Sequence, residues 1–321
     1  MEKGLVSIIT PCYNGEQYIE QYIKSILKQT YKKIQLIFIN DGSNDNTEEI
    51  LLAYENEIRE KGIDYTYIYQ ANKGQAAALN KALKLVHGEF LTWPDSDDVL
   101  AENSIEKRIE FLNQYKEYGL VRNAVNIIEF QTNKKIGEYN LNGKNVNEYI
   151  FEDLIMEKNV WFAPIAYMIR TKKFFEMNPK KEIFESKYGQ NWQMLLPISY
   201  NNKCGYMGEA LCNYYVRPDS HSRQNNGTLE IELDVTKGHE EIIENVLKDM
   251  KKFDEYKEMI SIKYAKKRLY LAYKYNDEEI AKKAITELKE KGYLKLKDKI
   301  KYYRIRYKVI NQIFKRVKRC E

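Results

Sequence analysis

The sequence contains few of the residues that bind transition metals or build disulfide frameworks. Its 321 residues include four cysteines, Cys12, Cys204, Cys212 and Cys320, with no Cys-x-x-Cys pair, and only three histidines. This pattern argues against a structural zinc site, a disulfide-stabilised secreted fold and a Ser-His catalytic pair. Widely spaced cysteines suit a reducing compartment, so we expect them to be free thiols.

Long apolar runs are also lacking. Mean hydropathy is −0.64, and no segment approaches the ~18 consecutive apolar residues of a membrane-spanning helix. The opening residues, MEKGLVSIIT, do not have the pattern of a signal peptide. We therefore expect a cytoplasmic location. Hydrophobic residues still make up 43% of the chain, which is enough for one large domain or two ordinary ones.

Charge is unevenly distributed along the chain. Residues 226–321 carry 25 Lys and Arg against 17 Asp and Glu, a net charge of +8. Residues 1–225 carry 27 against 30, a net charge of −3. The asymmetry predicts two regions with different roles, with a boundary near residue 225.

The first hundred residues alternate between strand and helix patterns. Apolar, β-branched runs occupy 5–10, 34–40, 64–70 and 88–93, and helical patterns fill the intervals between them. This alternation predicts an α/β fold with a mostly parallel sheet and helices on both faces. Residues 131–149 are polar and are expected to be loop. From about residue 230 the pattern becomes helical to the end of the chain.

Three carboxylates follow the fourth predicted strand, in the stretch GEFLTWPDSDDVL. Asp95, Asp97 and Asp98 occupy three of four consecutive positions and would repel one another. Two carboxylates separated by one residue suit a hard divalent cation, with water and ligand oxygens completing its shell. The alternative is that Asp97 or Asp98 caps a helix beginning near residue 102.

Polar and glycine-containing segments follow the other predicted strands, where ligands bind in such sheets. Asp41 suits a hydrogen bond from a base N–H, while Gly42 would allow close approach of a ligand; the alternative for both is a tight turn. Tyr13 lies where a base or ribose would pack, unless it fills the core. Lys73, beside Gly74, offers a charge for phosphate.

Four motifs in this order resemble family-2 glycosyltransferases of the GT-A fold. They are VSIITPCYNGEQYIEQYIKSILKQTYKKIQLIFINDGSNDNTEEI, NKGQAAALNKAL, GEFLTWPDSDDVL and, more loosely, YGQNWQMLLPISY. The resemblance is dense over 5–115 and weaker over 151–222. It implies transfer of a sugar from a nucleotide-diphosphate donor, with UDP favoured. The acceptor would be a glycan or a lipid-linked glycan in surface-polysaccharide synthesis, and the reaction would be inverting.

The resemblance also implies roles for individual residues. Asp97 and Asp95 would bind Mn²⁺ or Mg²⁺ on the diphosphate. The remaining donor contacts would come from the strand ends and a late segment that closes over the diphosphate: Thr10, Pro11, Tyr13, Asn14, Asp41, Gly42, Asn72, Lys73, Gly74, Asp95 and Arg217. His221, in the same late segment, would contact phosphate and would not act as a base.

The sequence departs from the family where a catalytic base is expected. Inverting members usually supply an Asp from a Glu-Asp pair, and the matching positions here are Gln190 and Asn191. An amide cannot take the acceptor proton. Asn191 would then orient the acceptor while another carboxylate acts, the candidates being Glu185, Asp153 and Asp219. Otherwise water or a substrate group takes the proton, or the protein binds its donor without turnover.

Two tryptophans are candidates for an acceptor platform, because an aromatic face packs on the apolar side of a sugar ring. Trp192 directly follows Asn191, and Trp161 lies in the earlier loosely matching segment, 151–176. Phe162 is instead expected in the core.

The last segment predicts a basic amphipathic helix. Its apolar stripe comprises Leu296, Ile300, Tyr303, Tyr307, Ile310, Phe314 and Val317. Residues 295–319 also carry eleven Lys and Arg and one Asp. Such a helix suits an anionic membrane surface; alternatively the stripe packs on preceding helices or forms an oligomer. No nucleic-acid motif is present. A nucleotidyltransferase would need a Gly-rich basic loop near residue 11, and an adaptor acting through 295–319 would not need the aspartates.

Overall fold

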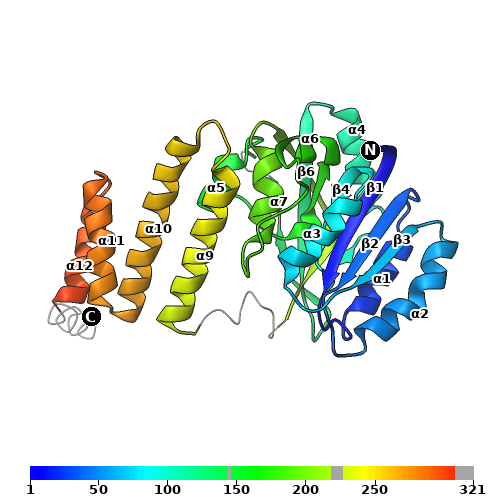
Figure 1. Ribbon diagram of the computed structural model, residues 1–321, viewed down its shortest axis with the longest axis horizontal. Helices are drawn as coiled ribbons and strands as arrows, with labels where there is room; N and C mark the ends of the chain where they lie inside the picture. Colours follow the sequence, from blue (N-terminus) through cyan, green and yellow to red (C-terminus); the bar gives the residue numbers. More distant parts are fainter. Residues whose placement is uncertain (143–145, 218–226, 308–321) are drawn as a thin grey trace. The chain divides into compact units, whose positions relative to one another are not determined.

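The computed structural model describes residues 1–142, 146–217 and 227–307. The chain divides into two compact units, Met1–Pro218 and Asp219–Glu321 (Figure 1). The two units are described separately below.

The first half of unit 1 is a parallel α/β sheet, as predicted. Its strands are β1 (Glu2–Cys12), β2 (Ile34–Asn40), β3 (Asp64–Tyr69) and β4 (Gly88–Thr92), in the spatial order β3-β2-β1-β4. The helices between them are α1 (Ile19–Leu27), α2 (Thr47–Glu60) and α3 (Gln75–Leu85). Every residue of β2 is buried, and its sequence is apolar except at Gln35 and Asn40, because helices cover both faces of the sheet.

The second half extends the same sheet in mixed orientation. Strand β8 (Tyr167–Arg170) pairs antiparallel with β4 and with β6 (Tyr118–Glu129), and β6 pairs parallel with β9 (Lys203–Val216). The two-residue strand β5 (Val99–Leu100) pairs antiparallel with β9. Half of the strand pairings are therefore antiparallel, and all of these involve residues beyond β4.

The prediction that residues 131–149 form a loop is partly wrong. Strand β7 (Lys134–Tyr139) lies within it and pairs antiparallel with β6 alone. Its residues are half-buried or exposed. A largely exposed edge strand has no apolar alternation from which it could be recognised.

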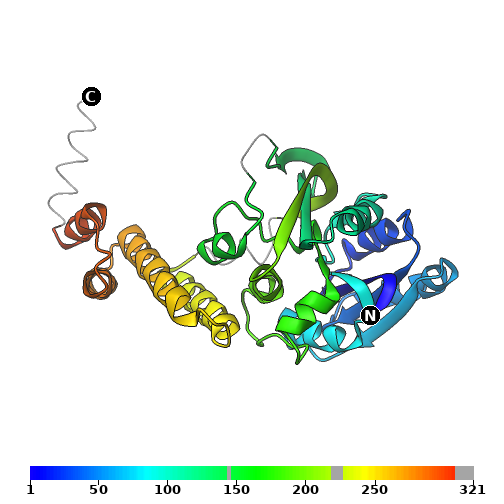
Figure 2. The ribbon, with the colours of Figure 1, turned by 90° about the horizontal axis from the view of Figure 1, so that it is seen from above.

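Helices cover both faces of this sheet. The remaining helices of unit 1 are α4 (Ser104–Gln114), α5 (Phe151–Met156), the 3₁₀ helix η1 (Pro164–Ala166), α6 (Thr171–Met177) and α7 (Gln190–Ser199). Helices α1 and α4 lie on one face of the sheet and α3 on the other (Figure 2).

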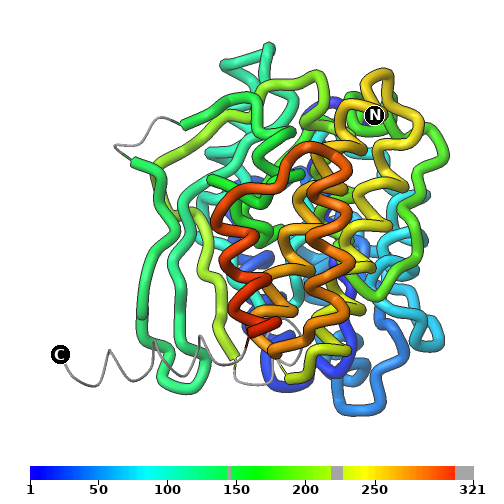
Figure 3. The backbone as a smooth tube through the Cα atoms, turned by 90° about the vertical axis from the view of Figure 1, so that its left-hand side faces the viewer, coloured from blue at the N-terminus to red at the C-terminus, as the bar shows by residue number. Residues whose placement is uncertain are grey.

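Unit 2 consists of successive packed helices (Figure 3). They are α9 (Leu229–Leu247), α10 (Phe253–Tyr275), α11 (Glu278–Glu290) and α12 (Leu296–Arg306). Small and medium apolar residues form the core between the last three: Ala265, Leu269, Ala272, Ala281, Ala284, Leu288 and Ile305. Within the described residues, no helix combines the length and apolar character needed to cross a bilayer.

The predicted apolar stripe of α12 does not pack on the preceding helices. Leu296, Ile300, Tyr303 and Tyr307 have exposed fractions between 44% and 73%. Ile305 faces the core instead. The packing alternative is therefore wrong for these four residues, whereas Ile310, Phe314 and Val317 lie outside the described residues.

Gln29 links α1 to the segment that follows the three aspartates. Its side chain is buried and donates from Nε2 to the carbonyl oxygens of Ser25 (2.9 Å) and Ala101 (2.8 Å). Its Oε1 accepts from the backbone N–H of Ile105 (3.2 Å), in the first turn of α4. The expected cap from Asp97 or Asp98 is therefore wrong, since Gln29 binds the first turn of the helix.

We predict that Gln29→Ala destabilises unit 1. The substitution removes three hydrogen bonds and leaves the N–H of Ile105 without its partner, which costs about 2–3 kcal/mol of unfolding free energy. Urea denaturation measures this loss. Gln17→Ala, at an exposed position, is the matched control, and equal denaturation midpoints for the two variants would contradict the role given to Gln29.

Candidate functional site

Loops from neighbouring strands meet at the carboxyl edge of the parallel sheet. The loops after β1 and β2 are joined by hydrogen bonds. The N–H of Asn14 donates to Ser43 Oγ, and the N–H of Asn44 donates to Asn14 Oδ1, both at 3.0 Å. Asn14 adopts a left-handed conformation (φ 51°), which asparagine tolerates better than most residues. Its main observed contact is thus to the β2 loop.

Asp41 is held by the loop that leads into α3. Its Oδ1 accepts from Gln70 Nε2 (2.6 Å) and from the N–H of Lys73 (3.0 Å), and its Oδ2 accepts from the N–H of Gly74 (2.8 Å). The structure thus brings together three candidates, Asp41, Lys73 and Gly74, from two motifs. A carboxylate has about four acceptor positions, so one remains on Oδ2.

The close approach expected at Gly42 is real, but its partner is the protein. Gly42 has φ +75°, and a Cβ there would lie 2.6 Å from the backbone nitrogen of Asn72. Only glycine fits such a position without displacing the backbone. Gly42 therefore fixes the loop after β3 in place, and Asn72 and Lys73 are exposed beside it.

The expected nucleoside contacts after β1 differ in exposure. Thr10 has no exposed surface, and its hydroxyl is hydrogen-bonded to that of Tyr22. Pro11 is also buried. The expectation that the Thr10 side chain contacts the donor directly is therefore wrong for this conformation, because the side chain is buried beneath the site. Tyr13 is 41% exposed, so the alternative that it fills the core is wrong.

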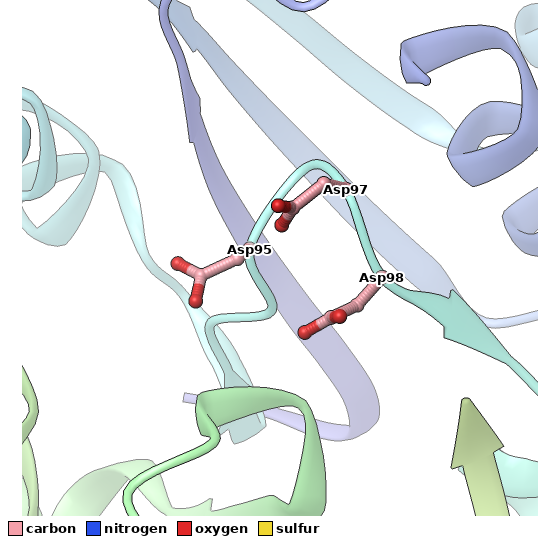
Figure 4. Close-up of side chains that lie close together, drawn as sticks. All are labelled: Asp95, Asp97 and Asp98. Carbon is pink, nitrogen blue, oxygen red and sulfur yellow. The ribbon is translucent and has the colours of Figure 1, made fainter. Parts of the chain in front are cut away.

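The three aspartates of the β4 loop converge (Figure 4). Each offers one carboxylate oxygen, and these oxygens all lie within 4.8 Å of one another. Different parts of the chain hold them. Asp95 Oδ1 accepts from Gln75 Nε2 (2.7 Å), and Asp98 Oδ1 accepts from the N–H of Tyr215 (3.1 Å). The sequence analysis assigns only Asp95 and Asp97 to a metal, and the structure places Asp98 in the same cluster.

Burial makes this cluster electrostatically unfavourable. Burial, followed by the charge of Asp97, raises the pKa of Asp95 to about 7. The same causes, with the charge of Asp95 added, raise the pKa of Asp98 well above its usual value. Asp98 Oδ2 is buried and has no hydrogen-bond partner among the described residues. A bound cation would offset these costs.

Arg217 provides positive charge at the cluster. Its Nη2 lies 2.9 Å from Asp97 Oδ2, and its guanidinium lies 4.3 Å from the ring centroid of Tyr18. Both members of the ion pair are largely buried, with side-chain exposures of 15% and 20%. Asp219 and His221, two further candidates from this region, lie outside the described residues.

Two glutamines connect α7 to the aspartates. Gln190 Nε2 donates to Gln75 Oε1, and Gln75 Nε2 donates to Asp95 Oδ1. Gln75 is the first residue of α3 and was not among the expected site residues. Its position directly after Gly74, at the carboxyl edge, was the available signal. The relay has a direction, because each amide donates toward Asp95.

Both polar groups of the Asn191 side chain are used by the protein. Its Oδ1 accepts from Trp93 Nε1 (3.1 Å), and its Nδ2 donates to the carbonyl oxygen of Phe162 (2.8 Å). A carboxylate at this position would have no hydrogen to donate to that carbonyl. These two hydrogen bonds give a structural reason for an amide at position 191. They also argue against the expectation that Asn191 orients the acceptor, because both of its polar groups already have partners in the protein.

The other candidate bases lie on separate segments. Glu185 is exposed beside α3, near Asn80 Nδ2 at 3.5 Å. Asp153 is in α5, and its Oδ2 accepts from Asn147 Nδ2 (3.0 Å). Neither is hydrogen-bonded to the aspartate cluster within the described part of the chain.

The assignment of the aromatic residues was partly wrong. Trp192, the favoured acceptor platform, is 5% exposed and donates from Nε1 to the carbonyl oxygen of Leu154 (2.9 Å). It is a core residue because the first turn of α7 packs on α5. Phe162, expected in the core, is only half-buried. Trp161 is half-buried between Tyr139 and Tyr214, with ring centroids 5.1 and 5.0 Å away.

Sequence comparison identifies the family. Residues 7–177, more than half of the chain, match the model of glycosyl transferase family 2. The chain belongs to this family. Its architecture is the GT-A fold with a helical C-terminal region.

Named relatives agree with this membership. The chain is 31% identical over 195 residues to glycosyltransferase GlyG of Streptococcus pneumoniae, covering 58% of this chain and 60% of the relative. It is 41% identical over 110 residues to TuaG of Bacillus subtilis, a putative teichuronic acid biosynthesis glycosyltransferase, covering 34% and 42%. An uncharacterised glycosyltransferase of Rickettsia typhi is 44% identical over 110 residues, covering 34% and 32%. The chain thus spans less than two thirds of each relative.

Solved structures share the fold. Residues 1–349 of Staphylococcus aureus TarS, in complex with UDP-GlcNAc, superpose with a TM-score of 0.56 at 17% identity, covering 94% of this chain and 90% of that one. The mannosyltransferase PcManGT of Pyrobaculum calidifontis, in complex with GDP-Man and Mn²⁺, gives 0.50 at 13% identity, covering 96% and 86%. At these identities the likeness concerns the fold alone.

We predict that Gln75→Leu raises the pKa of Asp95 further in the metal-free protein. The Gln75 amide donates to the ionised carboxylate and so lowers the pKa of Asp95. Removing the donor disfavours ionisation. Titration of ¹³C-carboxyl-labelled aspartates by NMR measures the change, with the exposed Gln17→Leu as control. An Asp95 pKa that is the same in both variants would contradict the relay.

Proposed function

We propose that this glycosyltransferase is metal-dependent and inverting. It moves a sugar from a nucleotide-diphosphate donor, UDP-linked in our proposal, to a glycan or lipid-linked glycan during surface-polysaccharide synthesis. The observation that carries the proposal is the aspartate cluster at the end of β4, with three carboxylate oxygens within 4.8 Å of one another. Residues 1–225 would form the catalytic region and residues 226–321 the helical region.

The cluster fits a hard divalent cation. Its donors are carboxylate oxygens, which Mg²⁺ and Mn²⁺ prefer, and the buried Asp98 Oδ2 has no partner among the described residues. Asp95 and Asp97 would hold the ion, with Asp98 as a third carboxylate beside them. A bound ion would stabilise the negative charge that develops on the diphosphate leaving group. The Mn²⁺ present with PcManGT is consistent with this proposal.

Other residues would bind the donor around this centre. The remaining acceptor position on Asp41 suits a uracil N–H, and the exposed Tyr13 ring lies at the end of the neighbouring strand. Arg217, beside Asp97, would hold diphosphate oxygens through its planar guanidinium. The UDP-GlcNAc bound to TarS and the teichuronic acid role attributed to TuaG support a UDP-sugar donor and a surface-polysaccharide acceptor.

A donor-binding protein without turnover is the second candidate. One observation favours it: the position of the usual base is Asn191, with both polar groups already used. In the active alternative, Glu185, Asp153, Asp219, water or a substrate group takes the acceptor proton. Release of UDP from UDP-sugars, measured with and without acceptor, separates the two candidates, since only a transferase increases release when acceptor is added.

We predict that wild-type protein binds UDP in an Mn²⁺-dependent manner and that Asp97→Ala removes this dependence. Loss of a metal-binding carboxylate should weaken metal-dependent binding by roughly tenfold or more. Calorimetric titration of UDP, with GDP and CDP for comparison, measures the affinity. Asp97→Asn controls for the broken Arg217 pair, and Glu102→Ala removes a nearby exposed charge. Failure of wild type to bind any nucleotide would contradict the proposed function.

We also propose that α12 contacts an anionic membrane surface. Its exposed residues Leu296, Ile300, Tyr303 and Tyr307 occur among the lysines and arginines of 295–319. An apolar strip bordered by positive charge suits the inner leaflet, where each nearby Lys or Arg contributes about 1 kcal/mol.

We predict that Leu296→Ser/Ile300→Ser weakens binding to phosphatidylglycerol-containing vesicles roughly tenfold, because two apolar side chains no longer enter the interface. Vesicle sedimentation measures the binding. Leu52→Ser/Leu85→Ser removes two exposed leucines from unit 1 and is the matched control. Unchanged binding in the α12 variant would eliminate the membrane contact and leave the nucleotide site unaffected.

A further inference from the structure

A hollow in unit 1 lies beside α3, and apart from Lys73 its lining residues have no proposed role in donor binding. Its volume is about 420 Å³, and its walls are α3, the end of the β3 loop and residues 182–185. Gln70 and Lys73 belong both to this wall and to the loop that holds Asp41. The hollow therefore begins at the carboxyl edge of the sheet.

The segment 182–185 is irregular but firmly held. Asn80 binds both backbone groups of Ile183: Oδ1 accepts from its N–H (2.7 Å) and Nδ2 donates to its carbonyl oxygen (2.9 Å). Gln193 does the same for Phe184, at 2.6 and 2.8 Å. Two side-chain amides thus replace the backbone hydrogen bonds that a strand would supply. The Phe184 backbone has little freedom to move.

Phe184 presents its ring on this fixed support. The side chain lines the hollow and is 46% exposed. An aromatic ring held at a fixed position needs little further ordering when a sugar ring packs against it, so stacking there is favourable. The ring therefore offers the sugar platform that the buried Trp192 cannot.

The charges around the hollow favour an acidic ligand. Lys73 and Lys81 line it and are exposed, with no acid within ion-pair distance among the described residues. Lys84 is paired with Glu182 at 2.8 Å. Glu185 is the opposing charge on the wall. The two lysines without an acid partner would attract a carboxylate or phosphate group.

The chain connects one wall of the hollow to the proposed metal site. Residues 182–185 continue through Gly189 to Gln190, whose amide reaches Asp95 through Gln75. We propose that the hollow is the acceptor subsite and takes an acidic oligosaccharide, with one sugar ring on Phe184 and its anionic group at Lys73 and Lys81. This inference rests on the proposed glycosyl transfer and names the class of its acceptor.

Two matched pairs of probes test the subsite by calorimetry. Hyaluronan tetrasaccharide and chitotetraose differ in their carboxylates, and phosphorylated and unphosphorylated mannopentaose differ in phosphate. We expect at least one acidic probe to bind wild type roughly two- to fivefold tighter than its neutral match. The acidic probe that does so identifies carboxylate or phosphate as the recognised group. Equal or absent binding of every pair would overturn the inference.

Variants locate the binding. Phe184→Ala should weaken the preferred probe roughly five- to tenfold, while Phe184→Trp should retain it. Lys81→Gln should remove the preference for the acidic probe, and the exposed Lys28→Gln should not. Probe binding that neither Phe184→Ala nor Lys81→Gln alters would also overturn the inference. Titration of UDP with Mn²⁺ on the same samples tests the donor site separately from the glycan subsite. Absence of UDP binding would contradict the donor site and leave the glycan subsite unaffected.

Discussion

The mutual repulsion of Asp95, Asp97 and Asp98 is the constraint on which the site depends. Three carboxylates in one largely buried loop require compensation, and no single neighbouring element supplies it. The Gln75 amide comes from α3, the Arg217 guanidinium from the end of β9, and the Tyr215 N–H from β9 itself. Satisfying the aspartates therefore brings the end of β4, the start of α3 and the end of β9 to one place.

Amide side chains organise the region next to the aspartates where we propose that the acceptor binds. Gln75 and Gln190 form a directional relay to Asp95, and Asn191 joins Trp93 to the Phe162 carbonyl. Asn80 and Gln193 hold the Phe184 segment. Amides suit these positions because one group both donates and accepts. Gln190 and Asn191, which replace the usual Glu-Asp pair, thus belong to a larger set of amides that hold this region together.

Features carried by local periodicity were predictable from the sequence. The strands and helices up to β4 follow from buried apolar runs such as β2 and from the polar strand ends that mark the ligand edge. Features that depend on long-range partners were not. Asp98 is buried because β9 lies against β5, and Trp192 is buried because α7 packs on α5. Neither contact leaves a local pattern in the sequence. The sequence alone therefore allows a helix cap at Asp98 and predicts an acceptor platform at Trp192.

In the proposed function, the aspartate cluster holds a divalent cation together with a nucleotide diphosphate. Anomalous diffraction at the manganese absorption edge, from crystals grown with Mn²⁺ and UDP, tests it most directly. We predict an anomalous peak for a manganese ion that is bonded to carboxylate oxygens of Asp95 and Asp97 and in contact with the diphosphate. Ordered UDP with no peak at the cluster, or with manganese bound only elsewhere, would contradict it.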